Sequence, residues 1–445
     1  MTAEPQAESR GARALEFLTQ IRSHELRAVA LAFACNFMLL ASYYVLRPVR
    51  DTVVMGYGVD ALQNLFTGTF VGTLIASPVY AVLASRITLK RLLPGIFWFW
   101  FLNVVLFAVL FSDAPSSSRR LAGAYYLWFS ISNLFMVSVF WTLMVDLFSP
   151  RQATRVFALI AAGGSTGAIA GPLAVRLLVH RLGIAGVLAL AAAGFLIVIV
   201  LVHLLMREKD RLREHGEEVQ TSRLDHRLEG NPFAGFRELV RSGYSLNQAG
   251  FMLLMTWVNT VGYFLQTDVI ASAFSGDEAR AVAVADISLV VNVGSALVAS
   301  FGLGRYVKRF GVTAGLALNP LIMLVAFVAL ALSPTLLMIQ ALQVVRQIGQ
   351  FAIARPSREM CFTVVDQESR YKTKNIIDTL VYRFGDVSAA WILAGLRAVG
   401  LRVEGSCAAG FGFSLLWGTV ALALGRRYES LRAAQAPAAG PADPA

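Results

Sequence analysis

Residues 28–56 read AVALAFACNFMLLASYYVLRPVRDTVVMG, an apolar stretch with charged residues near its end. A helix needs about 20 apolar residues to cross a bilayer, and the stretch exceeds this length. It nevertheless contains Arg47, Arg50 and Asp51. A charge in lipid costs from about 3 kcal/mol on insertion scales to more than about 10 in simulations. The stretch therefore predicts a membrane helix with a polar, functional end.

The three charged residues share one face of this helix, because they are spaced three and four residues apart. Tyr43 lies one turn earlier on the same face. Two arginines on one face suit an anionic ligand. The alternative is that the span ends near Arg47, which then reaches the phospholipid headgroups. Pro48 and the apolar residues after Asp51 favour a longer, kinked helix instead.

Composition extends this prediction to the whole chain. Of the 445 residues, 56% are hydrophobic and 15% are charged, with a mean hydropathy of +0.61, whereas soluble domains carry about 25% charge. We therefore expect an all-α integral membrane protein in the lipid bilayer. Apolar stretches predict twelve spans, at residues 28–56, 61–84, 92–112, 121–146, 156–179, 183–206, 246–274, 281–304, 312–332, 335–354, 376–396 and 405–425.

The basic residues predict the orientation. Most of the 39 Lys and Arg residues fall in connections that are cytoplasmic if the N-terminus is cytoplasmic, as the positive-inside rule requires. Both termini are then expected inside, in a bacterial cytoplasmic (inner) membrane. The net charge of +11 is explained by this topology and by anionic headgroups, so no nucleic-acid partner is expected.

A polar linker divides the chain into two related halves. The predicted parts are a cytoplasmic segment 1–27, a six-helix bundle 28–206, a cytoplasmic linker 207–245, a second six-helix bundle 246–425 and a disordered cytoplasmic tail 426–445. Asp146-Leu-Phe-Ser149 recurs as Asp366-Gln-Glu-Ser369, 220 residues later. Twelve spans in two six-helix bundles, with a long central loop, are typical of the major facilitator architecture.

The second half has its own charged residues within predicted spans. Lys374 lies just before the eleventh span and Asp378 near its start, and Arg383 and Asp386 lie deeper in it. Lys374 and Arg383 are candidates for substrate contact. The alternative is a basic anchor at the inner membrane surface with ion pairs that only fix the helices, an alternative that we favour for Arg370 and Lys372.

The tenth span carries a polar stripe, Gln343-Val-Val-Arg346-Gln347, at helical spacing. Such a stripe faces a cavity or another helix and not lipid. Arg346 is a further candidate anion ligand. Alternatively it pairs with an acid, for which Asp268 and Asp286 are the candidates.

Other sequence patterns indicate no ligand-binding, metal-binding or catalytic site. The small residues of 161–172 favour close helix packing. The three cysteines and five histidines have no metal-ligand or disulfide spacing, so neither a metal nor a cofactor is expected. Without a nucleophile motif or a nucleotide-hydrolysis loop, an enzyme is not expected.

Several strings resemble the ATP/ADP antiporter family, the nucleotide transporters of plastids and intracellular bacteria. Tyr44-Val-Leu-Arg-Pro-Val-Arg-Asp51 resembles the Leu-Arg-Asp-x-Lys-Asp string of that family's first span. Phe140-Trp141 with Gln152-Ala-Thr-Arg155, Arg355-Pro-Ser-Arg-Glu-Met360 and Lys372-Thr-Lys-Asn-Ile-Ile-Asp378 resemble further strings of the family, in the same order. The resemblance covers most of the chain.

The resemblance implies that Arg50 and Lys374 contact nucleotide phosphates. Two departures bear on this: Tyr126 stands where the family has an acid before a Leu-Trp pair, and the family's seventh-span acid is replaced by an uncharged residue near Gly262. Membership in the family therefore does not by itself establish ATP/ADP exchange.

The function expected from these observations is alternating-access exchange of an anionic phosphorylated metabolite, with nucleotides as candidates, by a monomer. The ligand would be bound at the interface of the halves by Tyr43, Arg47, Arg50, Arg346, Lys374 and Arg383, with Asp51, Asp268, Asp378 and Asp386 as ion-pair or coupling groups. One alternative is a proton-coupled carrier of a neutral or cationic compound in which Asp51 titrates. Another is a membrane scaffold that transports nothing, whose buried charges only fix helix packing.

Overall fold

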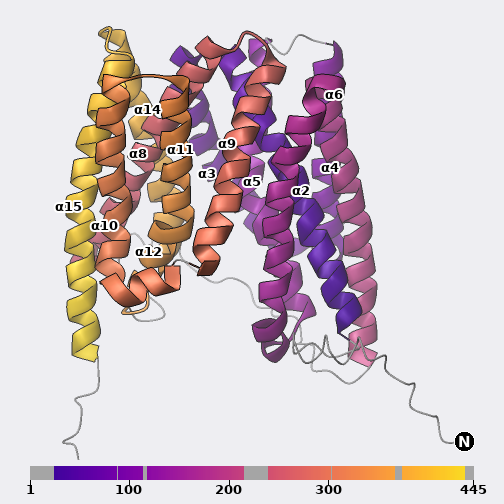
Figure 1. The fold of residues 1–445 in the computed structure, drawn as a ribbon. Helices are drawn as coiled ribbons and strands as arrows, with labels where there is room; N and C mark the ends of the chain where they lie inside the picture. The colour runs from indigo at the N-terminus through magenta and orange to yellow at the C-terminus, as the bar shows by residue number, and fades with distance from the viewer. Residues whose placement is uncertain are drawn as a thin grey trace, which may run out of the picture. The chain divides into compact units, whose positions relative to one another are not determined.

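The computed structural model describes residues 25–87, 89–113, 118–214, 239–301, 303–365 and 373–435 (Figure 1). Almost all of these residues are helical, and the described ranges contain no β-strand. Eight of the described helices are long and apolar enough to cross a membrane. A helix is the expected solution because lipid offers no partner for backbone polar groups, which a helix satisfies internally.

The helices of the first half coincide with the first six predicted spans. They are α2 (Leu26–Tyr57), the short η1 (Val59–Ala61), α3 (Leu62–Arg86), α4 (Leu89–Asp113), α5 (Arg119–Leu147) and α6 (Pro150–Glu214). α6 contains the fifth and sixth predicted spans, which meet at Gly183. The φ of 66° at this residue is one that glycine adopts without strain.

The helices of the second half coincide with the other six predicted spans. They are α8 (Gly243–Ala273), α9 (Asp277–Phe301), α10 (Leu303–Leu332), α11 (Leu336–Gly349), η3 (Gln350–Ala354), α12 (Arg355–Cys361), η4 (Ile377–Val381), α14 (Tyr382–Ala398) and α15 (Val403–Gln435). Together α11, η3 and α12 form the tenth span, and η4 with α14 forms the eleventh. α15 continues ten residues past its predicted end, so residues 426–435 are helical where a disordered tail was predicted. Most of the predicted linker, residues 215–238, lies outside the described residues.

Two segments of the second half are π-helices. η3 lies inside the tenth span directly after the polar stripe, and η4 lies in the eleventh span directly before Tyr382. A π-helical turn contains one residue more than an α-helical turn and is frequent at functional sites. The two π-helical turns therefore mark the part of the second half that carries the candidate residues.

Contacts divide the chain into two compact units. The first unit comprises Met1–Gly56, Gly72–Arg227 and Asp277–Leu289, and the second comprises Tyr57–Val71, Leu228–Gly276 and Val290–Ala445. Each unit therefore holds most of one half of the chain and the start of one helix from the other half. α3 begins in the second unit and ends in the first, whereas α9 begins in the first and ends in the second.

An ion pair lies in the first part of α9, and another lies just before α3. In the second unit, Asp60 before α3 pairs with Arg397 at 3.3 Å. In the first unit, Asp286 of α9 pairs with Arg176 at 3.1 Å. Arg176 and Arg397 are 221 positions apart, close to the 220-residue offset of the predicted repeat.

Glycines allow α2 and α6 to pack closely in the first unit. A Cβ atom added to Gly163, Gly167 or Gly171 would lie 2.5, 2.2 and 2.5 Å from the carbonyl oxygens of Phe33, Phe37 and Ala41 respectively. Glycines and carbonyls both recur every four residues, so one face of α6 contacts one face of α2. This is the close helix packing that the small residues of 161–172 predict.

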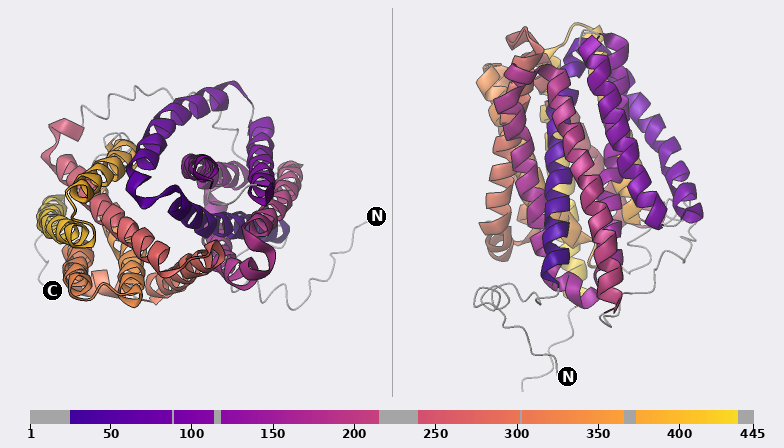
Figure 2. Two further views of the ribbon diagram at one scale, coloured as in Figure 1. Left: turned by 90° about the horizontal axis from the view of Figure 1, so that it is seen from above. Right: turned by 90° about the vertical axis from the view of Figure 1, so that its right-hand side faces the viewer.

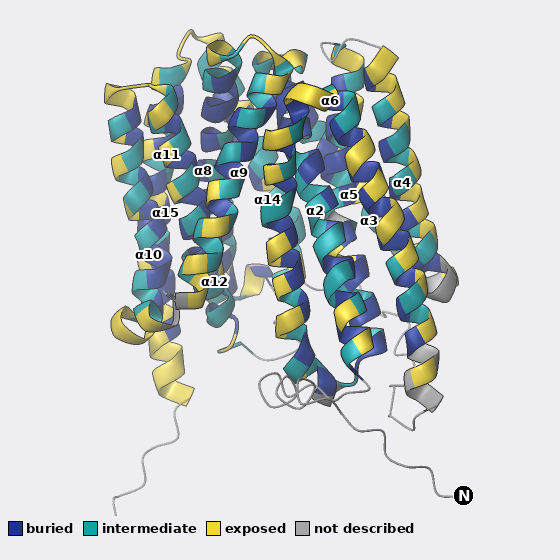
Figure 3. Cartoon of the chain, turned by 45° about the vertical axis from the view of Figure 1, so that its right-hand side comes forward, coloured by how far each residue is buried: buried dark blue, intermediate teal, exposed yellow. Residues whose placement is uncertain are grey.

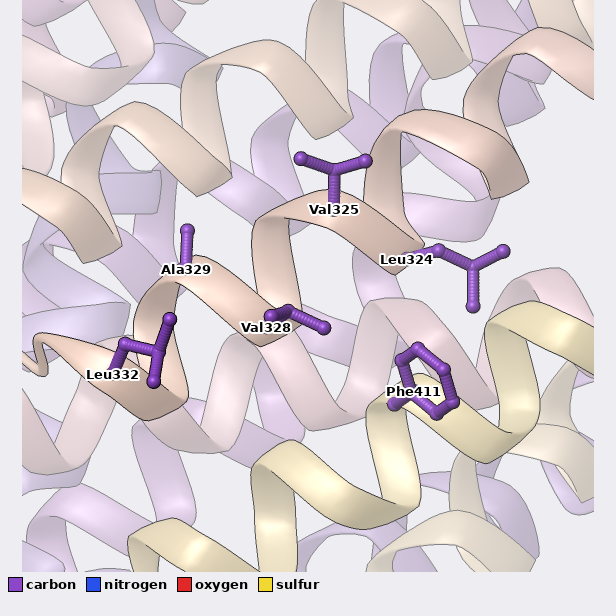
Figure 4. A pocket seen from close by; sticks show the side chains of 6 residues that line it. All are labelled: Leu324, Val325, Val328, Ala329, Leu332 and Phe411. Atoms are coloured by element: carbon purple, nitrogen blue, oxygen red, sulfur yellow. The ribbon is translucent and has the colours of Figure 1, made fainter.

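Apolar side chains cover the outer faces of the helices. α10 and α15 lie side by side within the second unit (Figure 2), and exposed residues recur along the described helices (Figure 3). Val325 and Leu332 of α10 are 71% and 82% exposed. A groove between these two helices is lined by Leu324, Val325, Val328, Ala329, Leu332 and Phe411 (Figure 4). Because lipid hydrocarbon is as apolar as these side chains, the groove suits a lipid-facing surface and not a polar ligand.

Candidate functional site

The charged residues of α2 lie in the first unit, in the second half of a continuous helix. The guanidinium of Arg50 donates to the carboxylate of Asp51, with Nε at 2.8 Å from Oδ1. Asp51 is buried, and Arg50 is half-buried. The pair is charge-assisted and removes part of the cost of keeping either group away from water.

Aromatic rings surround the guanidinium of Arg50. Its Cζ lies 5.3 Å from the ring centroid of Tyr126 and 5.4 Å from that of Phe129, both on α5. Tyr43 stacks on Phe129 with centroids 5.2 Å apart, and Arg47 lies 5.8 Å from the ring of Tyr44. Cation–π contacts of this kind stabilise a cation where water is scarce. We call Tyr43, Arg47, Arg50, Asp51, Tyr126 and Phe129 the α2 cluster.

Pro48 gives this part of α2 an unusual backbone. Proline has no N–H, so the carbonyl of Tyr44 loses its helical donor. Two residues further on, the hydroxyl of Tyr125 donates to the carbonyl of Leu46 at 3.2 Å. α5 thus contacts the backbone of α2 as well as its arginine, and this fixes the α2 cluster between two helices.

In the second unit, Arg346 of α11 is only 7% exposed. Its Nε donates to Oε1 of Gln343 at 2.8 Å, and its Nη1 donates to Oε1 of Gln350 at 3.2 Å and to Oδ1 of Asn259 on α8. Gln343 in turn donates to the carbonyl of Gly262 at 2.8 Å. We call Arg346, Asn259, Gln343 and Gln350 the Arg346 cluster.

Arg383 and Asp386 of α14 also face α8. They form an ion pair at 3.5 Å, and the hydroxyl of Thr260 donates to Asp386 at 3.3 Å. The Cζ of Arg383 lies 5.6 Å from the ring of Tyr382. Asp386, Arg383 and Arg346 all act electrostatically on Tyr382, so these charges occupy one neighbourhood.

Lys374 and Asp378 belong to a separate ion-pair network of the second unit. Lys374 pairs with Glu359, and Asp378 pairs with Arg358 at 2.8 Å. Arg358 also donates to Glu359 at 2.9 Å and is 2% exposed. The basic residues 370 and 372 and the Asp366–Ser369 repeat lie outside the described residues.

The two acids suggested as partners of Arg346 are engaged elsewhere. Asp268 of α8 pairs with Arg397, which also lies 5.2 Å from the ring of Phe264. Asp286 pairs with Arg176 in the first unit. The hydrogen bonds described above for Arg346 go to the amide oxygens of Asn259, Gln343 and Gln350. Asn259 was missed because a single Asn in an apolar span carries no signal of which way it points.

Neither cluster contains the ligands of a metal site. Within the described residues, His, Cys, Asp and Glu form no group of three or more that could hold a metal ion. The α2 cluster combines cationic and aromatic side chains, and the Arg346 cluster combines a cationic side chain with amides. Such groups bind anions and planar polar groups by charge-assisted and neutral hydrogen bonds.

Comparison with known proteins agrees with this architecture. Residues 15–365 match the Major Facilitator Superfamily, which is well over half of the chain. The chain belongs to this superfamily. It is also 22% identical over 463 residues to ADP,ATP carrier protein 1 of Chlamydia pneumoniae, covering 86% of this chain and 87% of that protein. The corresponding protein of Chlamydia trachomatis serovar D is 23% identical over 496 residues, covering 94% and 92%.

A solved structure shows the same superfamily fold. The inward-facing crystal structure of a bacterial homologue of the iron transporter ferroportin aligns with a TM-score of 0.64 and 12% identity, covering 90% of this chain and 99% of that one. The likeness, the family match and the apolar helices together identify an all-α, multi-pass membrane transporter with the fold of the Major Facilitator Superfamily, with which twelve spans are consistent.

Within this superfamily fold, the structure distributes the predicted site residues among four places. Tyr43, Arg47, Arg50 and Asp51 lie together in the α2 cluster. Arg346, Arg383 and Asp386 lie together in the second unit. Lys374 and Asp378 form the ion-pair network with Arg358, and Asp268 lies with Arg397. Tyr126, which marks a departure from the antiporter strings, contacts Arg50 directly.

Proposed function

We propose that this Major Facilitator Superfamily transporter exchanges an anionic phosphorylated metabolite by alternating access, and that the metabolite is a nucleotide. The observation that carries the proposal is that each unit keeps an arginine largely away from solvent beside other polar groups: Arg50 in the α2 cluster and Arg346 in the Arg346 cluster. Burying a guanidinium costs several kcal/mol, on the order of the Coulomb energy that a close anion returns. A phosphate group would supply that anion.

The balance of charge supports an anion over a cation. The α2 cluster contains two arginines and one carboxylate, and the neighbourhood of Arg346 contains Arg383 and one carboxylate, Asp386. Each therefore has one cation more than the acids named here. Guanidinium groups also bind phosphate oxygens with two parallel hydrogen bonds, which a lysine cannot do.

The residues proposed to bind the ligand are Tyr43, Arg47, Arg50, Arg346, Lys374 and Arg383. Asp51, Asp268, Asp378 and Asp386 are proposed to hold the basic groups while the site is empty. Exchange follows from the same electrostatics, because an uncompensated cationic site in low dielectric resists reorientation until an anion occupies it. The names of the two chlamydial relatives, ADP,ATP carriers, support the nucleotide as substrate class.

Counterflow in proteoliposomes tests the proposal. Vesicles preloaded with unlabelled ATP or ADP should take up labelled ATP faster than empty vesicles. Arg50→Ala should lower this exchange by about 10- to 100-fold, since a hydrogen bond to a charged group contributes about 1.5–3 kcal/mol. The matched control is Arg426→Ala, which removes an exposed arginine of α15 and should leave the exchange rate unchanged.

Other outcomes would favour the alternatives. Uptake that does not respond to any preloaded nucleotide or phosphate ester would contradict the proposal. Transport of a neutral or cationic compound driven by a pH gradient, and abolished by Asp51→Asn, would indicate a proton-coupled carrier. If no metabolite raises the unfolding temperature, the chain is a scaffold, because a ligand that binds the folded state must stabilise it.

We further propose that both termini face the cytoplasm of a bacterial inner membrane and that the chain works as a monomer. The basic connections between spans support the orientation. Single cysteines introduced at exposed ends of the described helices, with Cys35, Cys361 and Cys407 replaced, should react with an impermeant maleimide from the expected side only. The opposite labelling pattern would contradict the orientation.

A further inference from the structure

Glu359 of α12 lies between two cations of the ion-pair network in the second unit. Its Oε1 accepts from Nη2 of Arg358 at 2.9 Å, and its Oε2 accepts from Nζ of Lys374. Nη1 of Arg358 lies 2.8 Å from Oδ1 of Asp378. The carboxylate of Glu359 is therefore shared between two cations, one of which, Lys374, is a residue proposed to bind the ligand.

The two cations differ in their access to solvent. The side chain of Arg358 is 3% exposed, whereas those of Lys374 and Glu359 are 38% and 37% exposed. Nη1 of Arg358 also lies 2.9 Å from Sδ of Met252, so this guanidinium contacts α8 as well as the eleventh span. A dissolved anion can therefore reach Lys374, while Arg358 stays buried beside Glu359.

Two ion pairs join α12 to the start of the eleventh span. Lys374, three residues before η4, pairs with Glu359, and Asp378 in η4 pairs with Arg358. Lys374 and Asp378 are four residues apart, so they lie on one helix face. Because the second pair does not involve Lys374, it holds the two segments together when the first pair opens. The ammonium can thus change its partner without separating the spans.

Electrostatics favours this change of partner when a phosphorylated anion arrives. A nucleotide carries more negative charge than one carboxylate, so it attracts the ammonium more strongly at the same distance. A partly buried carboxylate without any partner would be costly. Arg358 removes this cost, because it remains beside Glu359 after Lys374 has left.

We propose that Glu359 competes with the phosphate groups of the ligand for Lys374 and thereby sets the affinity of the carrier for phosphorylated anions. In the empty carrier Glu359 neutralises Lys374. On binding, the ligand replaces Glu359 at Lys374, and Arg358 retains the released carboxylate. This inference rests on the proposed function and deepens it, since it gives a role to a carboxylate that binds no ligand itself.

Glu359→Gln tests the competition. The variant keeps the length of the side chain and an oxygen that can accept from Arg358, and it removes the charge that holds Lys374. The apparent KM for ATP in counterflow should fall by about two- to fivefold, which corresponds to the loss of a competing, partly exposed ion pair. In a Lys374→Met background the same substitution should leave KM unchanged, because Glu359 competes for Lys374 alone.

The matched control is Glu404→Gln, which makes the same substitution at an exposed position of α15 in the same unit. It should leave the KM for ATP unchanged. Glu359→Asp is the second test variant if Glu359→Gln unfolds too readily for assay. It keeps a carboxylate beside Arg358 and shortens the side chain that reaches Lys374, so it should also lower KM.

Three results would overturn the inference, and they differ. If wild-type protein exchanges nucleotides but Glu359→Gln leaves KM unchanged or raises it, Glu359 does not compete with the ligand. If Glu359→Gln lowers KM equally in the Lys374→Met background, Glu359 acts by general repulsion and not through Lys374. If wild-type protein binds and exchanges none of the phosphorylated anions, the proposed function itself fails, before any variant is compared.

Discussion

Gly167→Ala gives a sharp test of the close packing of α2 on α6. In the structure, an added Cβ at this position would lie 2.2 Å from the carbonyl oxygen of Phe37 and 3.0 Å from the backbone nitrogen of Ala41. Both neighbours are backbone atoms of α2, so no side chain can rotate away. The two helices would have to separate by about 1 Å before the contact reached ordinary van der Waals range.

The expected cost follows from this geometry. Overpacking a well-filled interface costs about 1–3 kcal/mol. Glycine to alanine in a helix otherwise favours folding by up to about 1 kcal/mol. Gly95→Ala in α4 is the control, because an added Cβ there meets nothing within 4 Å. The gain from alanine is common to both variants and cancels, so Gly167→Ala should be about 1–3 kcal/mol less stable than Gly95→Ala.

Thermal unfolding in detergent, followed by intrinsic fluorescence, measures the difference. One kcal/mol shifts the midpoint by about 2–4 °C for a unit of roughly 200 residues, so the midpoints of the two variants should differ by about 2–12 °C. The proposed exchange activity should also fall in Gly167→Ala, because α2 carries Arg47 and Arg50. Equal midpoints for the two variants would show that α2 and α6 do not approach each other as described.

Two further predictions concern ion pairs. Arg397→Gln and Asp268→Asn should each lower the unfolding midpoint. Their double mutant should be more stable than the sum of the two single effects predicts, by a coupling energy of about 0.5–3 kcal/mol. If the two effects on the free energy of unfolding are strictly additive, the ion pair contributes nothing. Glu25→Ala should lower the free energy of unfolding by about 2 kcal/mol, because it removes a fully buried partner of Arg155. Glu25→Gln preserves the shape of the side chain and should lower it less. The reverse order of the two variants in a thermal shift assay would contradict a role for the ion pair.

The spans could be predicted from sequence because hydropathy and length are local properties. The sequence could not show that α3 and α9 each join two units, since this depends on contacts between residues far apart in the sequence, such as Asp60 with Arg397 and Arg176 with Asp286. It also could not show the π-helices η3 and η4. An extra residue in a helical turn leaves the apolar pattern nearly unchanged.

The sequence could predict which residues belong to the candidate site, but it could not predict which side chains each of them contacts. Spacing placed Arg47, Arg50 and Asp51 on one face, but it could not place the ring of Tyr126 beside Arg50. For Arg346, charge alone suggested an acid as partner. The structure places the amide oxygen of Asn259 at Arg346 and pairs Asp268 with Arg397.

The course of α3 and α9 has a mechanical consequence. A continuous α-helix resists bending, and each of these helices is covalently part of both units. Any displacement of one unit must therefore be absorbed as strain near Val71–Gly72 and Leu289–Val290, or it must release the ion pairs that secure the helix starts. Stiffness of α3 and α9 at those two points should therefore slow the transport cycle.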